Sequence, residues 1–401
     1  MSKKELSRYG IMEKTETKAM SQKEGAELLG ISERHYRRLL KRYRENGVEG
    51  LISKKRGKPS NRRCPDKIKE KTLKLLKGKY KDFGPTFASQ KLEKDEQIKL
   101  SRETLRLWMI EEGLWKGKKQ KPIKLHQSRI RRSQEGELIQ VDGSPHDWFE
   151  GRRKPCSLLG YIDDATSKVM HLKFVESETT AGYLETMKEY LKIYGRPESF
   201  YTDRLSVFRV NTDKEGYKGK GLTQVGRALK ELGIELVCAN SPQAKGRIER
   251  LFNTLQDRLV KEMRLKKLST LEEGNEYLKE YIKEHNAHFS VVAQNKENKH
   301  KALLKEHNLE EILCYKSERT LSKNLEVSYE GRILQISQEK PSRAMRRAKV
   351  TVIETLEGEI KIEYQGKNLE YKELYVKDSQ GRVLNRKSLL GGTIPKKGMV
   401  A

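Results

Sequence analysis

Apolar positions in the first third of the chain recur at the spacing of helices. Ser21 and Glu24 form an S-x-x-E capping box, and the apolar residues that follow predict a short helix that ends near Gly30. Ser32 then begins a second helix, whose apolar positions are Tyr36, Leu39, Leu40 and Tyr43. Two short helices joined by a glycine turn predict a helix-turn-helix domain over residues 14–52.

A second group of helical patterns covers residues 66–116. Apolar residues from Ile68 to Leu76 predict one helix, and the Gly84-Pro85 pair ends the pattern before a helix over residues 87–92. A serine cap at 101 precedes a third helix, so we predict a second helix-turn-helix domain. The intervening segments 53–65 and 117–135 have few apolar residues and many basic ones, and we predict that both are linkers.

The middle of the chain alternates between short apolar runs and longer helical patterns. Strands are predicted at 138–142, 157–162, 168–174, 200–202 and 234–237, and helices at 180–194, at 222–232 and from about Arg247. Gly143-Ser144-Pro145 is predicted to turn the chain directly after Asp142. The order β-β-β-α-β-α-β-α predicts an α/β domain over residues 136–290, built on a mixed sheet with helices on its faces.

Alternating apolar and polar residues return after residue 320. Five short strands are predicted there, at 325–329, 332–336, 348–354, 360–364 and 368–374, and together they predict a small β-barrel over 320–376. Arg343, Arg346, Arg347 and Lys349 suggest a DNA-contacting patch on this domain. Residues 387–401 offer no core and are predicted to be a loose tail. The predicted architecture is therefore multidomain: all-α, then α/β, then β.

The net charge is unevenly distributed along the chain, and this distinguishes the predicted domains. The 401 residues carry a net charge of +28, of which +19 lies in residues 1–140, +2 in 141–260 and +7 in 261–401. A basic block joined to a neutral one is typical of a nucleic-acid-binding module attached to another activity. Neither a membrane-spanning apolar run nor a signal peptide is present, and the four cysteines match no zinc or disulfide spacing, so we expect a cytoplasmic protein with reduced thiols.

Basic residues on the predicted recognition helices are the candidate DNA contacts. The helix that enters the major groove in a helix-turn-helix presents its exposed side chains to the DNA. Arg56 and Lys58, in the first linker, have the extended basic setting typical of a minor-groove element. A solvated basic face is the alternative interpretation for each helix. The candidates in these three segments are Arg34, Arg37, Arg38, Arg42, Arg56, Lys58, Arg102 and Arg106.

Three carboxylates fall where strands and a helix of the α/β domain meet. Asp142 and Asp203 each follow a predicted strand, and Glu249 lies in the first turn of the helix that begins near Arg247. Ligand sites in α/β sheets collect at strand ends, and three adjacent acids repel one another unless a cation binds between them. Carboxylates suit Mg²⁺ or Mn²⁺, and a pair of such ions can promote an in-line displacement at phosphorus. The alternative for Asp142 is a cap on an Asp-Gly turn, and Asp163 and Asp164 are expected in turns or in support of the ligands.

Four stretches in the right order resemble the DDE motifs of bacterial insertion-sequence transposases, with the ISNCY group as the nearest match. They are Gln140–Phe149, Leu159–Thr166, Tyr201–Phe208 and Ser241–Arg250. The resemblance implies an integrase-like RNase H fold, with Asp142, Asp203 and Glu249 as catalytic metal ligands for two Mg²⁺ or Mn²⁺ ions. One departure is Arg204-Leu205, where related transposases commonly carry Lys-His, so no histidine is available there to assist catalysis.

The resemblance also implies the reaction and the partners. The expected activity is cleavage at transposon ends by water, followed by attack of the freed 3′-OH on target DNA, by a homo-oligomer of at least two subunits on DNA. Residues near the acids are expected to help: Lys245, Arg247 and Arg250 by holding phosphates, and His146 and Asn253 by supporting the site. A basic rim or an ordinary structural role is the alternative for each of them. The alternative functions are a catalytically inactive DNA-binding regulator and a metal-dependent nuclease that cuts without joining.

Overall fold

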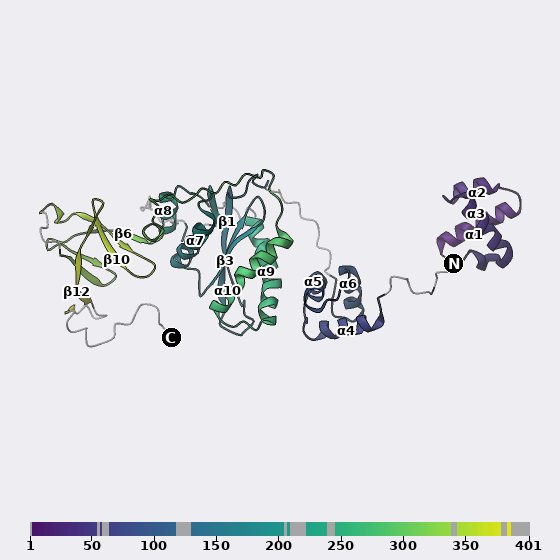
Figure 1. The fold of residues 1–401 in the computed structure, drawn as a ribbon, viewed down its shortest axis with the longest axis horizontal. Coiled ribbons are helices and arrows are strands. Elements are labelled where there is room, and N and C mark those ends of the chain that lie inside the picture. Colours follow the sequence, from purple (N-terminus) through teal and green to yellow (C-terminus); the bar gives the residue numbers. More distant parts are fainter. Residues whose placement is uncertain are drawn as a thin grey trace, which may run out of the picture. The chain divides into compact units, whose positions relative to one another are not determined.

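The structure of the protein is a computed structural model that describes residues 2–53, 57, 64–117, 130–203, 207–208, 222–238, 245–337, 343–377 and 383–385. The chain divides into two compact units, Met1–Lys118 and Lys119–Ala401 (Figure 1). Several residues named from the sequence lie outside the described residues. These are Arg56, Lys58, Arg204, Leu205 and the 387–401 tail.

The first unit begins with three helices: α1 (Lys3–Glu16), α2 (Gln22–Leu28) and α3 (Glu33–Asn46), followed by the 3₁₀ turn η1 (Gly47–Leu51). The capping box at Ser21 and Glu24 is present as expected. Helix α1, which the sequence reading missed, starts with its own capping box between Ser2 and Glu5. Tyr36 is fully buried among these helices, where its hydroxyl lies 2.6 Å from Thr15 Oγ1.

Gly25 permits this close packing of α2 against α3. A Cβ atom at this position would lie 2.5 Å from the Tyr36 hydroxyl oxygen, closer than side chains tolerate. The glycine therefore lets the ring of Tyr36 reach Thr15 on α1, and the three helices share one small core.

Three more helices complete the first unit: α4 (Asp66–Lys77), α5 (Pro85–Glu96) and α6 (Arg102–Glu111). Pro85 begins α5 at a position where its missing N–H costs nothing, and the Ser101 hydroxyl caps α6 by accepting from the amide of Thr104. Helices α5 and α6 pack on each other, and Phe83 stacks on Phe87 with ring centroids 4.7 Å apart. This segment thus contains a helix at each of the three predicted positions, and its assignment as a second helix-turn-helix domain stays a prediction.

The second unit is organised around a five-stranded mixed sheet in the order β3-β2-β1-β4-β5 (Figure 1). Its strands are β1 (Leu138–His146), β2 (Cys156–Asp163), β3 (Val169–Val175), β4 (Ser199–Thr202) and β5 (Glu235–Cys238). Strands β1, β2 and β3 pair antiparallel, whereas β4 runs parallel to both β1 and β5. The predicted order of strands and helices is confirmed.

The prediction that the first strand ends at Asp142 is wrong. Strand β1 continues through Gly143-Ser144-Pro145 to His146, and Asp142 pairs opposite Gly160 in the middle of the β1–β2 ladder. Pairing with β2 holds this Asp-Gly-Ser-Pro segment extended in spite of its local preference for a turn. The parallel pairing of β1 with β4, however, stops at Gln140, so Asp142 still lies just beyond the carboxyl end of that pair.

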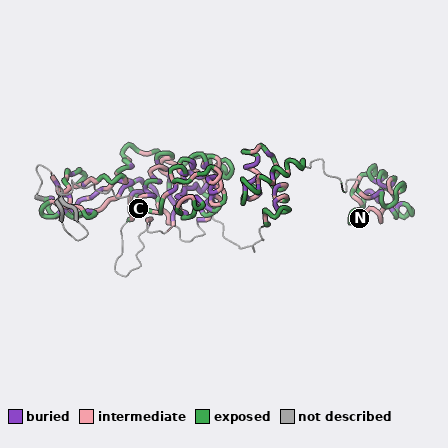
Figure 2. The backbone as a smooth tube through the Cα atoms, turned by 90° about the horizontal axis from the view of Figure 1, so that it is seen from below, coloured by how far each residue is buried: buried purple, intermediate pink, exposed green. Residues whose placement is uncertain are grey.

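Two layers of helices cover the sheet. Helices α7 (Thr180–Tyr194) and α8 (Gln224–Glu231) pack on the face that includes Ile139, Val141 and Leu159. Helices α9 (Gly246–Leu265) and α10 (Leu271–Phe289) cover the opposite face, which includes Leu158 and Leu172. Alternate residues of β2 therefore enter different cores, as the pleat requires, and all eight of its residues are buried. Figure 2 shows buried residues in purple in the interior and exposed residues in green around them.

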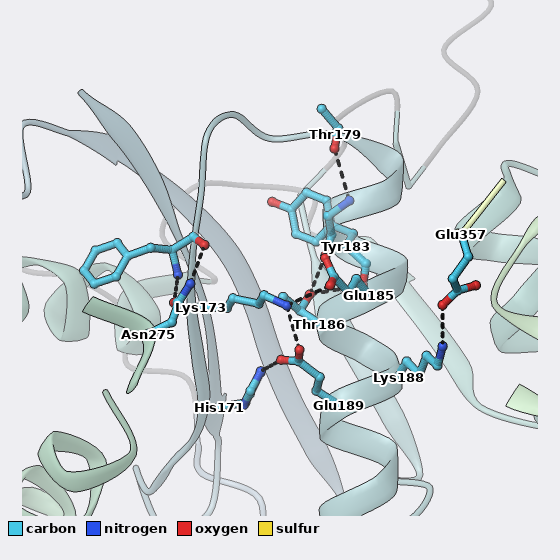
Figure 3. A network of polar contacts seen from close by, with 12 residues as sticks. His171, Lys173, Thr179, Tyr183, Glu185, Thr186, Lys188, Glu189, Asn275 and Glu357 are labelled. Atoms are coloured by element: carbon cyan, nitrogen blue, oxygen red, sulfur yellow. Dashed lines mark hydrogen bonds and ion pairs between the residues drawn. The ribbon is translucent and has the colours of Figure 1, made fainter. Parts of the chain in front are cut away.

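A polar network ties α7 to the edge strand β3 (Figure 3). Glu189 accepts hydrogen bonds from Lys173, at 2.6 Å, and pairs with His171 at 2.9 Å. Burial by itself would raise the pKa of Glu189, but these two partners outweigh it and lower that pKa to about 2. On α10, the side chain of Asn275 exchanges two hydrogen bonds with the backbone of Phe174, so both helices are fixed to β3.

The region after α10 does not contain the predicted closed barrel. A short helix, α11 (Leu309–Ile312), is followed by two four-stranded sheets in the orders β11-β10-β9-β6 and β13-β12-β8-β7, and no described strand belongs to both. The two sheets share one core, to which Leu334 contributes from one sheet and Val352 from the other. The strands are β6 (Tyr315–Thr320), β7 (Glu326–Tyr329), β8 (Arg332–Ile336), β9 (Lys349–Glu354), β10 (Ile360–Tyr364), β11 (Lys367–Leu369), β12 (Tyr371–Lys377) and β13 (Val383–Asn385).

Eight strands are described in this region, where five were predicted: β6 and β13 were not predicted, and β11 and β12 divide the strand predicted at 368–374. Strand β6 is mostly polar and half-exposed, so its sequence carries little of the alternation that marks a buried strand. It is held by pairing with β9 along its whole length and by contacts with the α/β domain. Gln224 Nε2 donates to the carbonyl of Lys316 at 2.7 Å, and Arg227 donates to the carbonyl of Cys314, just before the strand, at 2.6 Å.

Candidate active site

Asp142 lies on the sheet face covered by α9. It follows Gln140 by two residues along β1, so their side chains share a face, and Gln140 contacts the start of α9. The Asp142 side chain is 20% exposed. Burial raises the pKa of Asp142 above its ordinary value, the nearby Lys245 ammonium opposes this, and the charge of Asp203 adds to the increase.

Asp203 and Asp142 meet at one cation, the side chain of Lys245. Asp203 follows the last residue of β4, and Lys245 is the residue before α9. The Lys245 Nζ atom lies 2.8 Å from Asp142 Oδ1 and 3.7 Å from Asp203 Oδ2. The parallel neighbours β1 and β4 thus bring two of the three predicted acids to one point, just beyond the end of their pairing.

Glu249 lies one helical turn beyond Lys245, in the first turn of α9. Its side chain is exposed, in contrast to the buried Ile248 and Leu251 on either side. Within the described part of the chain, no three His, Cys, Asp or Glu side chains are close enough together to share a metal ion. The structure therefore brings Asp142 and Asp203 together, with Glu249 nearby on the adjoining helix but not grouped with them.

A buried hydrogen-bond network fixes the start of α9 to β1, and sequence reasoning did not find it. Gln140 Oε1 accepts from the backbone N–H of Ile248 at 3.2 Å, and Gln140 Nε2 donates to Asp164 Oδ1 at 2.8 Å. Arg247 donates to the same Asp164 oxygen at 2.9 Å. Gln140 and Asp164 are both fully buried, so this network sets the register between the strand of Asp142 and the helix of Glu249.

The carboxylates of Asp163 and Asp164 have structural roles, because both accept hydrogen bonds from neighbouring segments of the chain. Asp163 accepts from the amide of Gly136 at 3.0 Å and from both the amide and the hydroxyl of Thr166 at 2.7 Å, which closes the turn between β2 and β3. Asp164 also accepts from the backbone N–H of Arg132 at 2.9 Å. Their carboxylate oxygens thus accept hydrogen bonds from protein donors.

A further carboxylate, Glu178, lies against the backbone next to Asp142. A Cβ on Gly143 would be 2.2 Å from Glu178 Cδ, so a larger residue there would displace this carboxylate from its present position. The Tyr183 hydroxyl donates to Glu178 Oε2 at 2.9 Å. Burial, with the charges of Glu178 and Asp142 beside it, raises the pKa of Tyr183 well above its ordinary value. Gly143 is the signal in the sequence for this close approach, although the Gly143-Ser144-Pro145 pattern favours a turn.

The remaining residues expected near the acids are distributed differently. His146 is exposed at the far end of β1, about 13 Å along the strand from Asp142, and its ring contacts Trp148. Arg247 is paired with Asp164 and its side chain is only 10% exposed, so reaching DNA would break that pair. Arg250 and Asn253 are exposed on α9 near Glu249.

The candidate DNA-contacting residues of the first unit lie mostly on helix surfaces. Arg34, Arg37 and Arg38 are exposed on α3, although Arg37 pairs with Glu33 at 3.1 Å. Arg42 is half-buried and donates to the carbonyl of Ile52, which secures the turn after α3. On α6, Arg102 is exposed, and Arg106 forms two hydrogen bonds to Glu103.

Comparison with known proteins identifies the class. A family model described as a helix-turn-helix domain matches residues 9–60. The chain is 40% identical over 373 residues to a protein named as transposase y4bF of Sinorhizobium fredii (strain NBRC 101917 / NGR234). The match covers 93% of this chain and 81% of that protein. The chain is 30% identical over 382 residues to the transposase for insertion sequence IS1202 of Streptococcus pneumoniae, covering 86% of this chain and 81% of the relative.

The chain therefore belongs to the family of insertion-sequence transposases. Among solved structures, it is similar to the HTLV-2 integrase catalytic core domain in complex with magnesium (15% identity, TM-score 0.28, 36% of this chain and 86% of that one). It is also similar to a chain of the simian T-cell lymphotropic virus intasome in complex with a PP2A regulatory subunit (12% identity, TM-score 0.32, 75% and 96%). No helix among the described residues is long and apolar enough to cross a membrane.

Proposed function

We propose that this transposase cleaves DNA at the ends of its own element and joins the freed 3′-OH ends to target DNA. The observation that carries the proposal is the meeting of Asp142 and Asp203 at one cationic group, Lys245 Nζ. Two acids from neighbouring parallel strands that already share a cation form a donor set suited to a hard divalent metal ion. Because the chain belongs to a family of transposases, we propose that the substrate at this donor set is a DNA phosphodiester.

Asp142, Asp203 and Glu249 would hold Mg²⁺ or Mn²⁺, which when bound supplies Lewis acidity at the scissile phosphate. Each acid has a distinct support in the fold. Pairing with β2 fixes Asp142, the β4 strand end presents Asp203, and the first turn of α9 carries Glu249. Glu249 must approach the two aspartates to complete the set, and it is the member that has the exposure to do so.

The proposed chemistry consists of two displacements at phosphorus. In the first, water attacks the phosphodiester at the element's end, the P–O3′ bond breaks, and the products are a 3′-OH and a 5′-phosphate. In the second, that 3′-OH attacks a target phosphodiester and displaces the target 3′-oxygen, which leaves with a proton. Neither step changes an oxidation state or forms a covalent bond to the protein.

DNA binding is assigned to both parts of the chain. The helix-turn-helix at residues 9–60 supports DNA recognition through α3, with Arg34 and Arg38 among its exposed cations. We propose that α6, with Arg102, serves a second DNA segment and that Arg250 contacts the phosphates nearest the acids. Because two ends must be joined together, we propose that at least two subunits assemble on the DNA.

The test is an assay for cleavage and joining with duplex DNA that carries the two ends of the encoding element. With Mg²⁺ or Mn²⁺, the full chain should nick the ends and then transfer them to a second duplex, and chelation of the metal should stop both reactions. Binding without cleavage would favour the inactive regulator. Cleavage without transfer, at any ratio of ends to target, would favour the nuclease.

A further inference from the structure

Lys245 occupies an unusual position for a lysine. Its side chain is 7% exposed, although lysine is among the residues most rarely buried. The ammonium contacts Asp142 at 2.8 Å and lies 3.7 Å from Asp203, so it sits between the acids that are proposed to bind metal. Among the described residues, both ion-pair partners of this ammonium are these carboxylates.

The arrangement balances charge within a partly buried space. Asp142 and Asp203 are 20% and 35% exposed, and two such carboxylates repel one another when no cation lies between them. The Lys245 ammonium offsets part of that repulsion, but it carries only one positive charge and its reach is limited by its side chain. A divalent ion brings twice the charge and accepts more oxygen ligands.

We propose that Lys245 is an internal cation that holds Asp142 and Asp203 together in the metal-free protein and is displaced when a divalent metal binds. This inference rests on the proposed function, because it assumes that the metal binds at these aspartates. The ammonium and the metal compete for the same carboxylate oxygens, so they cannot both occupy the position between the two acids.

The same competition accounts for the position of Glu249. Lys245 is the residue before α9 and Glu249 lies in its first turn, so both lie at the end of the helix that is joined to β1 through Gln140. While the ammonium lies between the aspartates, Glu249 remains exposed and outside their group. Departure of Lys245 opens that space to Glu249 and frees the ammonium for a DNA phosphate.

The experiment measures Mn²⁺ binding to the full-length chain without DNA. The signal of free Mn²⁺ in electron paramagnetic resonance gives the affinity, and an Asp142→Asn/Asp203→Asn variant gives the background from other sites. Lys245→Met removes the ammonium but keeps an unbranched side chain. The matched control is Lys261→Met, which removes another largely buried lysine of α9, paired with Asp257 on the same helix.

We expect Lys245→Met to bind Mn²⁺ roughly three- to tenfold more tightly than the wild type, because no ammonium must be displaced. The metal-free variant should melt at a lower temperature, and Mn²⁺ should raise its melting temperature more than it raises that of the wild type. Lys261→Met should leave the Mn²⁺ affinity unchanged. Lys245→Gln, which retains a polar head group, should shift the affinity in the same direction and serves if the methionine variant does not fold.

Unchanged or weaker Mn²⁺ binding in Lys245→Met and Lys245→Gln would overturn the inference while leaving the proposed function standing. So would a gain in affinity that persists in the Asp142→Asn/Asp203→Asn background, because Lys245 would then act elsewhere. If the wild type and the lysine variants show no Mn²⁺ binding that depends on Asp142 and Asp203, the metal site itself is wrong, and both proposals fail together.

Discussion

The side chain of Gln140 accepts a hydrogen bond from the backbone N–H of Ile248, with the two atoms 3.2 Å apart. Gln140 lies two residues before Asp142 on β1, and Ile248 comes immediately before Glu249 on α9. The first residues of a helix have N–H groups without a partner inside the helix, and this side chain satisfies one of them. The strand and the helix that carry two of the proposed metal ligands are therefore joined directly.

Gln140→Met should weaken both the fold and the reaction. It removes the acceptor for Ile248 and one donor to Asp164, and leaving such buried groups unpaired costs about 1–3 kcal/mol. Chemical unfolding would measure the loss, and the cleavage assay should show a slower rate. Gln256→Leu is the control, since Gln256 also joins α9 to β1, through Ser144, but two turns further from the acids. Equal losses of cleavage in both variants would contradict a special role for Gln140.

Gly143→Ala should destabilise the protein because its methyl group would overlap the carboxylate of Glu178. We expect about 1 kcal/mol, because Glu178 has a flexible, partly exposed side chain that can turn away and would then lose its hydrogen bond with Tyr183. In a Glu178→Ala background the same glycine change should cost much less, so the two substitutions should be non-additive in thermal unfolding. Gly246→Ala, where no atom lies within 4 Å of the new Cβ, should be nearly neutral. Additive losses at 143 and 178 would rule out the contact.

His285 should make stability depend on pH. Burial, with Arg258 and His288 nearby, lowers its pKa to about 4, whereas an unfolded histidine titrates near 6.5. Between these values the unfolded chain binds the extra proton, so stability rises with pH and is lost as pH falls from about 6.5 towards 4, by up to about 1.4 kcal/mol per pH unit.

Calorimetric unfolding at pH 5, 6 and 7 would measure this dependence. His285→Phe should flatten it, since no group that titrates in this range then remains at the position. His288→Gln, an exposed change one turn along α10, should leave most of it in place. A pH dependence that is unchanged in His285→Phe would assign it to other groups.

Arg34→Ala combined with Arg38→Ala should weaken DNA binding and its dependence on salt. Each lost phosphate contact reduces the slope of log K against log salt by about 0.9, so the double variant should lower it by roughly 1 to 2. Fluorescence anisotropy over a series of salt concentrations would give the slope. Arg44→Ala is the matched control on α3, because Arg44 is already paired with Glu16 at 2.6 Å. A similar change of slope in Arg44→Ala would argue for general charge in place of a docked helix.

Much of the sheet could be predicted because its strands are short apolar runs that end at acidic or glycine-containing segments. The path of β1 through Gly143-Ser144-Pro145 could not, since these residues favour a turn locally and only the β2 ladder holds them extended. Helix α1 had a readable capping box at Ser2 and Glu5 that the sequence reading passed over.

The proximity of Asp142 and Asp203 could be predicted from the sequence, but the positions of the basic residues around them could not. Strand β4 runs parallel to β1, and Asp142 and Asp203 both lie just beyond the end of that pairing. Lys245 is enclosed between these acids, and Arg247 is paired with Asp164. Both positions depend on packing at the start of α9, which the spacing of apolar residues in the sequence does not predict. The three basic residues look alike in the sequence, yet only Arg250 is exposed.

The most direct test of the central claim is strand cleavage of terminal DNA by Asp142→Asn, Asp203→Asn and Glu249→Gln, each compared with the wild type in Mg²⁺. Each change keeps the size of the side chain and removes the charge that would hold the metal. We predict that each variant binds the DNA as the wild type does and cleaves it at least about 100-fold more slowly. Cleavage at the wild-type rate by any one of the three would contradict the assignment.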